Sequence, residues 1–212
     1  MTAKQKLLVY GAGGHAKVVI DIIERQGSYD VAAVLDDDAG LKGSDCFGHG
    51  VLGGRAELAG LWSAGLRLAI VTIGENASRS ALAAELSAQG WEFALAVHPH
   101  ASISRGVEIA PGSVIMAGCV INADARIGAH SIINSGASVD HDCRIAEGVH
   151  IAPGCHLCGG VSVGRGTFLG AGSTVTPGVN IGSKVIVGAG SVVIRDVADG
   201  SKISGAPART RE

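Results

Sequence analysis

The sequence predicts a small α/β domain with a Rossmann-like parallel sheet, followed by an all-β domain built of short repeats. Three observations predict this fold class. Apolar segments with the periods of strands and helices alternate in the first half of the chain, and aliphatic residues recur at every sixth position in the second half. Glycine contributes 33 of 212 residues and aromatic residues only 3%, which favours many tight turns over a helix bundle.

The alternating segments occupy residues 1–97, which we expect to form one domain. The strands are expected at 6–10, 31–35, 66–73 and 91–97, and the helices at 17–26, 55–61 and 76–89. Strands and helices in this order predict a small parallel sheet with helices on both faces. The dipeptide His98-Pro99 is the expected junction, because proline favours extended backbone before it, and residues 98–212 then form the second domain.

A glycine-rich turn, Gly11-Ala-Gly-Gly-His-Ala16, follows the first expected strand, and Asp36 follows the second strand about 20 residues later. Glycines let the backbone approach a phosphate, and a helix N-terminus favours negative charge. The first half is too short for a full dinucleotide domain beside a catalytic domain. We therefore favour a nucleotide-linked sugar over NAD as the ligand, and a tight turn without a ligand is the alternative.

The six-residue period runs from Ile103 to Val193, through sixteen positions that are all Ile, Leu or Val. It fits neither the period of about 3.6 residues of a helix nor the period of about 2 residues of a strand. It predicts a chain that runs straight briefly and turns a corner, so that three hexapeptides form one triangular coil with the aliphatic residues inside. Small residues two positions earlier leave room beside them, at Ala101, Ser113, Cys119, Ala125, Ser131, Ala137, Cys143, Cys155, Thr167, Ser173 and Ser191.

Charge and cysteine content exclude several function classes. The 17 basic and 19 acidic residues nearly balance, and without a basic tail we expect neither nucleic-acid nor membrane-surface binding. The apolar runs are too short or too interrupted for a secretory signal or a membrane span. Five cysteines without a framework spacing indicate reduced thiols of a cytoplasmic protein, and three of them (Cys119, Cys143 and Cys155) are expected to be packing residues.

Seven short motifs carry a resemblance that covers almost the whole chain: Tyr10-Gly-Ala-Gly-Gly-His15, Leu35-Asp36-Asp37, Ile73-Gly74, Asn134-Ser135, Val139-Asp-His-Asp-Cys143, His150-Ile-Ala-Pro-Gly154 and Gly205-Ala-Pro-Ala-Arg209. With these motifs the chain resembles the sugar-nucleotide acyltransferases of the sialic-acid O-acetyltransferase, bacillosamine and perosamine N-acetyltransferase type. The resemblance implies that the repeats wind as a left-handed parallel β-helix. It also implies acetyl-CoA as cosubstrate and a homotrimer with the active site between subunits.

The resemblance also implies roles for individual residues. His141 matches the general base, Asp142 the acidic neighbour that raises its basicity, and His150 a contact to the acetyl-CoA thioester. Ala171 and Ala189 match positions where the main chain contacts the cofactor. The expected contacts to the nucleotide-linked sugar are Gly13, Gly14, His15, Asp36, Asp37, Gly74 and Asn134.

The expected chemistry agrees with these residue types. A sugar amine is largely protonated at neutral pH, and histidine has a suitable pKa to remove a proton from it. A thioester is already activated, so we expect no metal and no covalent enzyme intermediate. The oxyanion that forms needs a hydrogen-bond donor, which a backbone N–H or His150 is expected to supply.

The predicted reaction is N-acetylation of an amino-deoxy sugar, at C4, with GDP-perosamine as the favoured substrate. Asp36 and Asp37 offer two acceptors for guanine, whereas uracil presents one donor. A UDP-4-amino sugar and sialic-acid-type O-acetylation are the alternatives within the family. A metal-dependent hydratase and a noncatalytic nucleotide-sugar-binding scaffold are alternatives outside it.

Overall fold

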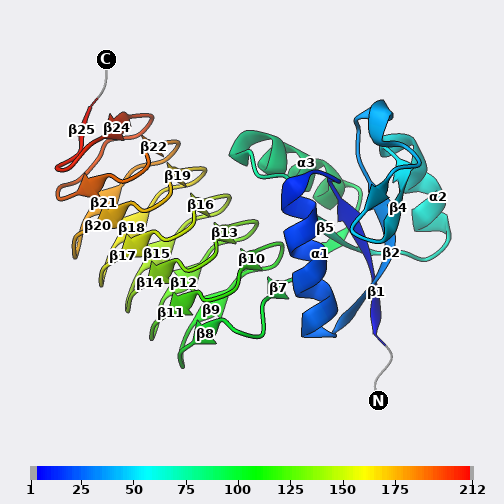
Figure 1. Ribbon diagram of the computed structural model, residues 1–212, viewed down its shortest axis with the longest axis horizontal. Helices are drawn as coiled ribbons and strands as arrows, with labels where there is room; N and C mark the ends of the chain where they lie inside the picture. The colour runs from blue at the N-terminus through cyan, green and yellow to red at the C-terminus, as the bar shows by residue number, and fades with distance from the viewer. Residues whose placement is uncertain (1–3, 211–212) are drawn as a thin grey trace. The chain divides into compact units, whose positions relative to one another are not determined.

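The computed structural model describes residues 4–210, and the chain divides directly after Pro99 into two compact units (Figure 1). The first unit contains one sheet with the strand order β3-β4-β2-β1-β5-β6. Its strands β4, β2, β1, β5 and β6 run parallel, and β3 pairs antiparallel with β4. The strands of this unit are β1 (Gln5–Tyr10), β2 (Tyr29–Leu35), β3 (Asp45–Cys46), β4 (His49–Gly53), β5 (Leu68–Val71), β6 (Glu92–Phe93) and β7 (Ala96–Val97).

Helices cover both faces of this sheet, as the alternating pattern predicts. The α-helices are α1 (Gly14–Gln26), α2 (Leu58–Ser63) and α3 (Asn76–Ala88), and two short 3₁₀ helices are η1 (Ala39–Leu41) and η2 (Arg55–Glu57). On one face, Leu8 and Leu35 form a buried cluster with Leu58 of α2 and Leu86 of α3. Because side chains alternate along a strand, Leu7 and Val9 point to the opposite face, where α1 packs on β1 and β2.

The structure differs from the prediction in two places of this unit. The expected strand 91–97 is two short strands, β6 and β7, and the hairpin β3–β4 was not predicted at all. Phe47 and Gly48 connect this hairpin with φ values of 53° and 85°. Two consecutive residues with positive φ are typical of a type I′ turn, which Asn-Gly signals more clearly than Phe-Gly does.

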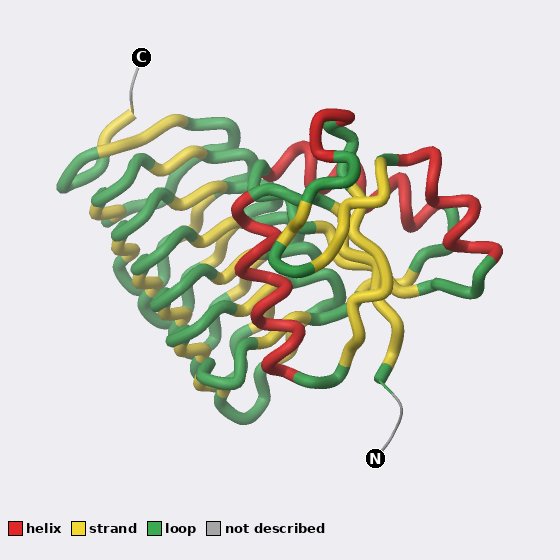
Figure 2. Tube along the Cα trace, turned by 45° about the vertical axis from the view of Figure 1, so that its right-hand side comes forward, coloured by secondary structure: helices red, strands yellow, loops and turns green. Residues whose placement is uncertain are grey.

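The second unit is a triangular prism of two-residue strands, in which each strand pairs in parallel with the strand one coil later (Figure 2). The first face contains β10 (Val114–Ile115), β13 (Ile132–Ile133), β16 (His150–Ile151), β19 (Phe168–Leu169) and β22 (Ile186–Val187). The second contains β8 (Ser102–Ile103), β11 (Val120–Ile121), β14 (Ser138–Val139), β17 (His156–Leu157), β20 (Thr174–Val175) and β23 (Val192–Val193). The third contains β9 (Glu108–Ile109), β12 (Arg126–Ile127), β15 (Arg144–Ile145), β18 (Ser162–Val163) and β21 (Asn180–Ile181).

The aliphatic period marks the core of this prism correctly. From Ile115 to Val193 every member of the series is buried, whereas Ile103 in the first coil is 39% exposed. Cys119, Cys143 and Cys155 are fully buried beside the series, and their thiols lie against carbonyl oxygens of the next coil. Burial raises the pKa of all three thiols, that of Cys119 to about 11, so they fill space as inert thiols.

A second six-residue period, which we did not recognise in the sequence, forms the corners. Every sixth residue from Gly106 to Gly190 has a positive φ, between 55° and 77°. Most of these residues are glycine, which adopts this conformation without steric cost. The exceptions are Asp124, His130, Asp142 and Lys184.

The last elements end the prism with a change of direction. Strand β24 (Lys202–Ser204) continues the first face in parallel with β22, and β25 (Arg209–Thr210) returns antiparallel to β24. Among the described residues, no helix has the length and apolar character that crossing a membrane requires.

Candidate active site

His141 and Asp142 form the corner that follows strand β14. The Nδ1 atom of His141 lies 2.8 Å from Oδ2 of Asp142, and the two side chains are 62% and 67% exposed. Asp142 occupies a corner position with a φ of 60°. The pair therefore lies on the outer surface of the β-helix, as its position after an inward residue predicts.

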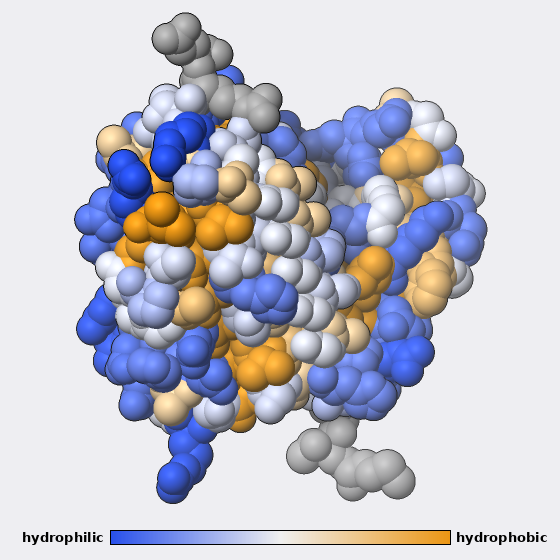
Figure 3. Space-filling view, turned by 60° about the vertical axis from the view of Figure 1, so that its left-hand side comes forward, coloured by the Kyte–Doolittle hydropathy of each residue, from blue (hydrophilic) through white to orange (hydrophobic). Residues whose placement is uncertain are grey.

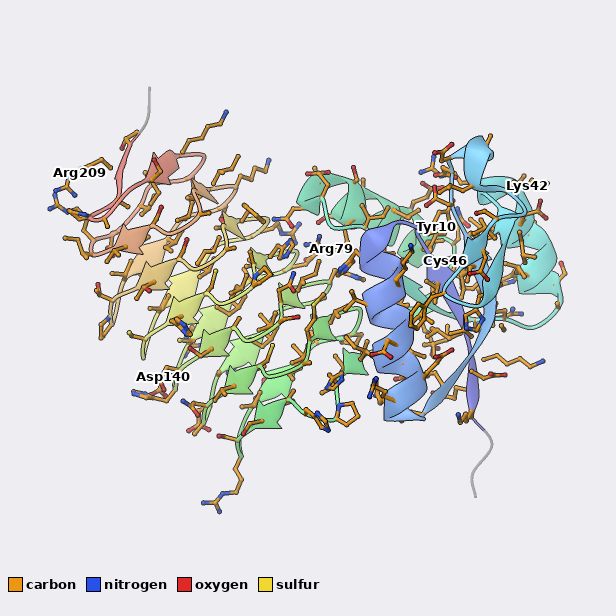
Figure 4. The ribbon with its side chains drawn as sticks, in the orientation of Figure 1. Tyr10, Lys42, Cys46, Arg79, Asp140 and Arg209 are labelled. Atoms are coloured by element: carbon orange, nitrogen blue, oxygen red, sulfur yellow. The ribbon has the colours of Figure 1, made fainter. Side chains whose placement is uncertain are left out.

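Asp140 adds a second carboxylate to this corner, at the edge of the prism where Figure 4 labels it. Its Oδ1 accepts hydrogen bonds of 2.8 Å from the Asn122 amide and from the backbone N–H of His141. These hydrogen bonds, that from Asn122 above all, lower the pKa of Asp140. The hydrogen bond to Asp142, followed by the charge of Asp140, raises the pKa of His141 above its ordinary value of 6.5.

This arrangement defines which nitrogen of His141 is available to accept a proton. With Asp142 accepting a hydrogen bond at Nδ1, the proton of the neutral imidazole resides on Nδ1. Nε2 then carries the lone pair and faces away from Asp142. The corner is suited to accept a proton from a substrate at Nε2, which is the function of a general base.

His150 and Asn134 form a second polar pair. His150 lies on strand β16, and Asn134 follows directly after strand β13. The Asn134 Nδ2 atom lies 3.1 Å from Nε2 of His150, and its Oδ1 accepts a hydrogen bond of 2.8 Å from the N–H of Ser135. Because the Ser135 N–H requires the oxygen on its side, the amide N–H₂ must face His150. Nε2 of His150 is therefore the acceptor, and its Nδ1 carries the proton.

The expected cofactor contacts lie elsewhere on the β-helix. His150 is half-buried and packs edge-on against Phe168, with ring centroids 5.2 Å apart. Ala171 and Ala189 are exposed corner residues one coil apart. A groove of about 870 Å³ lies over the third face, and its lining includes Arg126, Arg144, Ser162, Asn180 and Asp196 but neither His141 nor His150.

The glycine turn of the first unit follows β1 and opens α1. Gly11 has a φ of 116°, and a Cβ there would lie 2.8 Å from Oγ1 of Thr72, so the turn requires glycine. Gly13 is the N-cap of α1 and supplies no side-chain cap, whereas Glu75 caps α3 by accepting from the N–H groups of Ala77 and Ser78. No side chain therefore caps the N-terminus of α1, which begins with Gly14 and His15, and a helix N-terminus favours an anion.

Asp36 and Asp37 both accept hydrogen bonds from the protein itself. Asp36 holds the glycine turn, accepting from the N–H of Ala12 at 2.7 Å and from that of Asp38 at 2.8 Å. Asp37 accepts from the Tyr10 hydroxyl at 2.8 Å and pairs with Arg55. Burial, followed by this hydrogen bond, raises the pKa of Tyr10, so Tyr10 remains a donor. Each carboxylate is held in place and retains lone pairs for a further donor.

Arg79 is a functional candidate that sequence reasoning missed. Only 1% of it is exposed, and its guanidinium donates to the carbonyl oxygens of Ile73 and Gly74 and to Oδ1 of Asn76. Burial lowers its pKa to about 10, which leaves the charge in place at neutral pH. Arg79 therefore fixes the loop that carries Gly74. An arginine in an amphipathic helix normally indicates an exposed position, so the sequence contains no signal for this role.

Within the part of the chain that the structure describes, no three His, Cys, Asp or Glu side chains lie close enough together to hold a metal ion.

A hexapeptide prism with an acid-paired surface histidine, joined to an α/β unit with an uncapped glycine turn, defines the class of hexapeptide-repeat transferases. Comparisons with known families agree with this class. The PglD N-terminal domain matches residues 6–86, the bacterial transferase hexapeptide (six repeats) matches residues 100–135 and 142–177, and the hexapeptide repeat of succinyl-transferase matches residues 160–195.

Two solved structures resemble the chain over nearly its whole length. The H141N mutant of perosamine N-acetyltransferase from Caulobacter crescentus, in complex with CoA and GDP-perosamine, is 42% identical with a TM-score of 0.94, covering 99% of this chain and 98% of that one. The acetyltransferase domain of PglB from Neisseria gonorrhoeae FA1090, in complex with acetyl coenzyme A, is 34% identical with a TM-score of 0.91, covering 99% and 100%. The chain therefore belongs to the PglD-like family of sugar-nucleotide acetyltransferases with a left-handed hexapeptide β-helix.

A curated relative gives a shorter match. UDP-N-acetylbacillosamine N-acetyltransferase of Bacillus subtilis (strain 168) is 41% identical over 114 residues, which is 53% of this chain and 52% of that protein. The match thus spans about half the length of this relative. The family resemblance expected from the motifs is confirmed, together with the predicted fold class.

Proposed function

We propose that the protein transfers the acetyl group of acetyl-CoA to the C4 amino group of a nucleotide-linked amino-deoxy sugar, with GDP-perosamine as the favoured acceptor. The observation that carries this proposal is the surface pair His141–Asp142, on a chain 42% identical over almost its full length to an enzyme crystallised with CoA and GDP-perosamine. That relative was crystallised as variants of a histidine with the same number, which supports the choice of His141.

The geometry of the corner supports the following reaction. The sugar amine attacks the thioester carbonyl carbon and forms the new C–N bond, while Nε2 of His141 accepts the proton that the nitrogen loses. Asp142 stabilises the imidazolium through Nδ1. The C–S bond of the tetrahedral intermediate then breaks, and the coenzyme A thiolate leaves with the proton that His141 returns. The atoms balance without a covalent enzyme intermediate, which is consistent with the buried cysteines.

We assign the two substrates to different elements. His150, Ala171 and Ala189 are the proposed contacts to acetyl-CoA, and a backbone N–H or His150 is proposed to donate to the oxyanion that forms. Gly13, Gly14 and His15 are proposed to receive the nucleotide at the uncapped start of α1, beside Asp36, Asp37 and Gly74. Asn134 is proposed to act on the sugar side and, through its amide, on His150.

The active site is proposed to be completed by a neighbouring subunit in a homotrimer. His141 and Asp142 lie on an open surface of one chain, where water would compete with the substrate. Figure 3 shows apolar side chains gathered on one face of the molecule, and the β-helix exposes the large apolar residues Ile103, Val120, Ile186 and Ile194. Burying such residues between copies would stabilise an assembly.

The test is release of the coenzyme A thiol, with GDP-4-amino-4,6-dideoxymannose and a UDP-4-amino sugar offered in parallel, while light scattering gives the oligomeric state. Turnover with the GDP sugar alone is expected. Turnover with the UDP sugar alone would retain the mechanism and discard the guanine assignment of Asp36 and Asp37. Acetylation of a hydroxyl in place of an amine, identified by mass spectrometry after mild base treatment, would indicate O-transfer. Absence of turnover with either sugar would contradict the proposed acceptor class.

A further inference from the structure

Gly159 lies directly under the imidazole of His141, one coil further along the β-helix. A Cβ at Gly159 would lie 2.6 Å from both Cε1 and Nε2 of His141 and 3.2 Å from Cδ2. Real Cβ atoms do not approach other heavy atoms this closely. The ring therefore occupies the space that any other residue at 159 would fill.

The backbone gives no other reason for glycine at this position. The following residue, Gly160, has a φ of 70° and takes the left-handed corner position, whereas Gly159 lies outside that region. The same position of this corner carries Arg105, Ala123 and His141 in the preceding coils and Pro177 in the next coil, and other corners carry larger side chains such as Glu147 and Arg165. The close approach of the His141 ring is thus the constraint that requires glycine here.

We infer that Gly159 is a positioning residue. Because it has no side chain, it leaves the space in which the His141 ring lies with Nδ1 at Asp142 and with Nε2 toward the acceptor. The inference rests on the proposed function and deepens it. Asp142 holds one edge of the ring, and a hydrogen bond alone leaves an exposed imidazole free to tilt about it. The bare α-carbon of Gly159 allows the ring to lie flat against the next coil. A methyl group there displaces the ring and separates Nδ1 from the carboxylate.

The experiment replaces Gly159 with alanine and follows two quantities. In the intact protein, with 13C-labelled histidine and no substrate present, the NMR titration of His141 should show its pKa falling toward the ordinary value; the His141→Asn variant assigns the signal. In the thiol-release assay, kcat should fall by about 10²-fold, the cost of a displacement of roughly 1 Å at a reacting group. An unchanged His141 titration together with an unchanged kcat would overturn the inference.

Two controls separate positioning from folding. Ala117→Ser adds one atom at the same corner position of another face, where Ser135 already stands one coil later, and should leave kcat and melting temperature unchanged. In a His141→Ala background the Gly159→Ala change should cause no further loss of activity and no loss of stability. If Gly159→Ala alone fails to fold while the double variant folds, the clash with His141 is confirmed. If the double variant also fails to fold, Gly159 has a purely structural role and the inference is wrong.

The outcome is distinguishable from failure of the proposed function. If the unmodified protein acetylates no nucleotide-linked amino sugar, the proposed function fails, yet the histidine titration still decides whether Gly159 positions the ring.

Discussion

Asp142 stands at a corner position that is glycine in most coils, and from there its Oδ2 lies 2.8 Å from Nδ1 of His141. Aspartate tolerates the left-handed conformation better than most residues but not without strain, which amounts to about 1 kcal/mol or more. The β-helix therefore carries a less favourable residue at this corner than glycine, and the position gains a carboxylate for the adjacent imidazole. The residue with the strained backbone is thus the one whose carboxylate contacts the proposed general base.

Replacing Asp142 with asparagine should lower kcat by about 10-fold to 10²-fold and shift the pH dependence. In the proposed mechanism the neutral imidazole is the base, so activity is expected to rise with pH through the pKa of His141. Removing the largest cause of the raised pKa moves this limb of the kcat/KM profile to lower pH. Asparagine also tolerates the φ of 60°, so the fold should persist. An acidic limb that stays in place would show that Asp142 does not control the base.

Replacing His141 with asparagine should reduce kcat by about 10²-fold to 10⁴-fold, the usual contribution of a positioned general base. Acetyl-CoA binding, measured by calorimetry, should stay close to normal because the thioester contact is assigned to His150. His156→Asn is a matched control, since His156 lies on β17, the strand that pairs with β14, and bonds Ser138 rather than a carboxylate. Unchanged turnover in the His141 variant would remove this residue as the base.

Replacing Ile145 with aspartate should destabilise the β-helix by about 4 kcal/mol or more, because it buries an unpaired charge in an apolar core. Ile145 is 3% exposed on the inner side of β15, whereas its neighbour Arg144 points outward. Arg144→Asp is therefore the control, with a charge placed on the same strand but in solvent. Thermal melting of both variants checks the register, and a native melting temperature for the Ile145 variant would contradict it.

Replacing Asn134 with aspartate should move the proton of His150 from Nδ1 to Nε2. The carboxylate accepts a hydrogen bond where the amide donated one, so Nε2 must become the donor. The 15N chemical shifts of the imidazole distinguish the two tautomers. Loss of the donor at Nδ1 should also lower kcat, while Asn134→Gln keeps an amide as a partial control. A His150 signal that is unchanged by the aspartate would mean that Asn134 does not determine the tautomer.

The sequence predicts the β-helix well because one physical requirement repeats. Each coil must bury an aliphatic residue in the same place, and from Ile115 to Val193 all of them are buried. The corner period was harder to recognise, because aspartate, histidine and lysine replace glycine at Asp124, His130, Asp142 and Lys184. Asp142, the carboxylate of the candidate site, is itself one of these substitutions, so it interrupts the pattern that would have located the corner.

The site of the first unit was predicted less completely. The motifs indicate the glycine turn and Asp36, but they do not show that Asp36 holds the turn through the N–H of Ala12. Arg79 was missed because its burial depends on the carbonyl groups of Ile73 and Gly74, which only the folded loop brings together. Such contacts between side chains and backbone groups depend on the folded loops, and a periodic pattern in the sequence does not reveal them.

The antiparallel pairing of β25 with β24 has a consequence for self-association of the protein through the edge of this sheet. A stack of parallel strands presents unpaired N–H and C=O groups at its open edge, which is a template for another copy to add end to end. Here β25 covers the edge of β24 with exposed Arg209 and Thr210 in the reverse strand direction. On this face of the prism, another chain therefore meets a polar strand of reversed direction rather than a continuation of the parallel stack. Strand β25 thus disfavours end-to-end addition of parallel strands at this sheet.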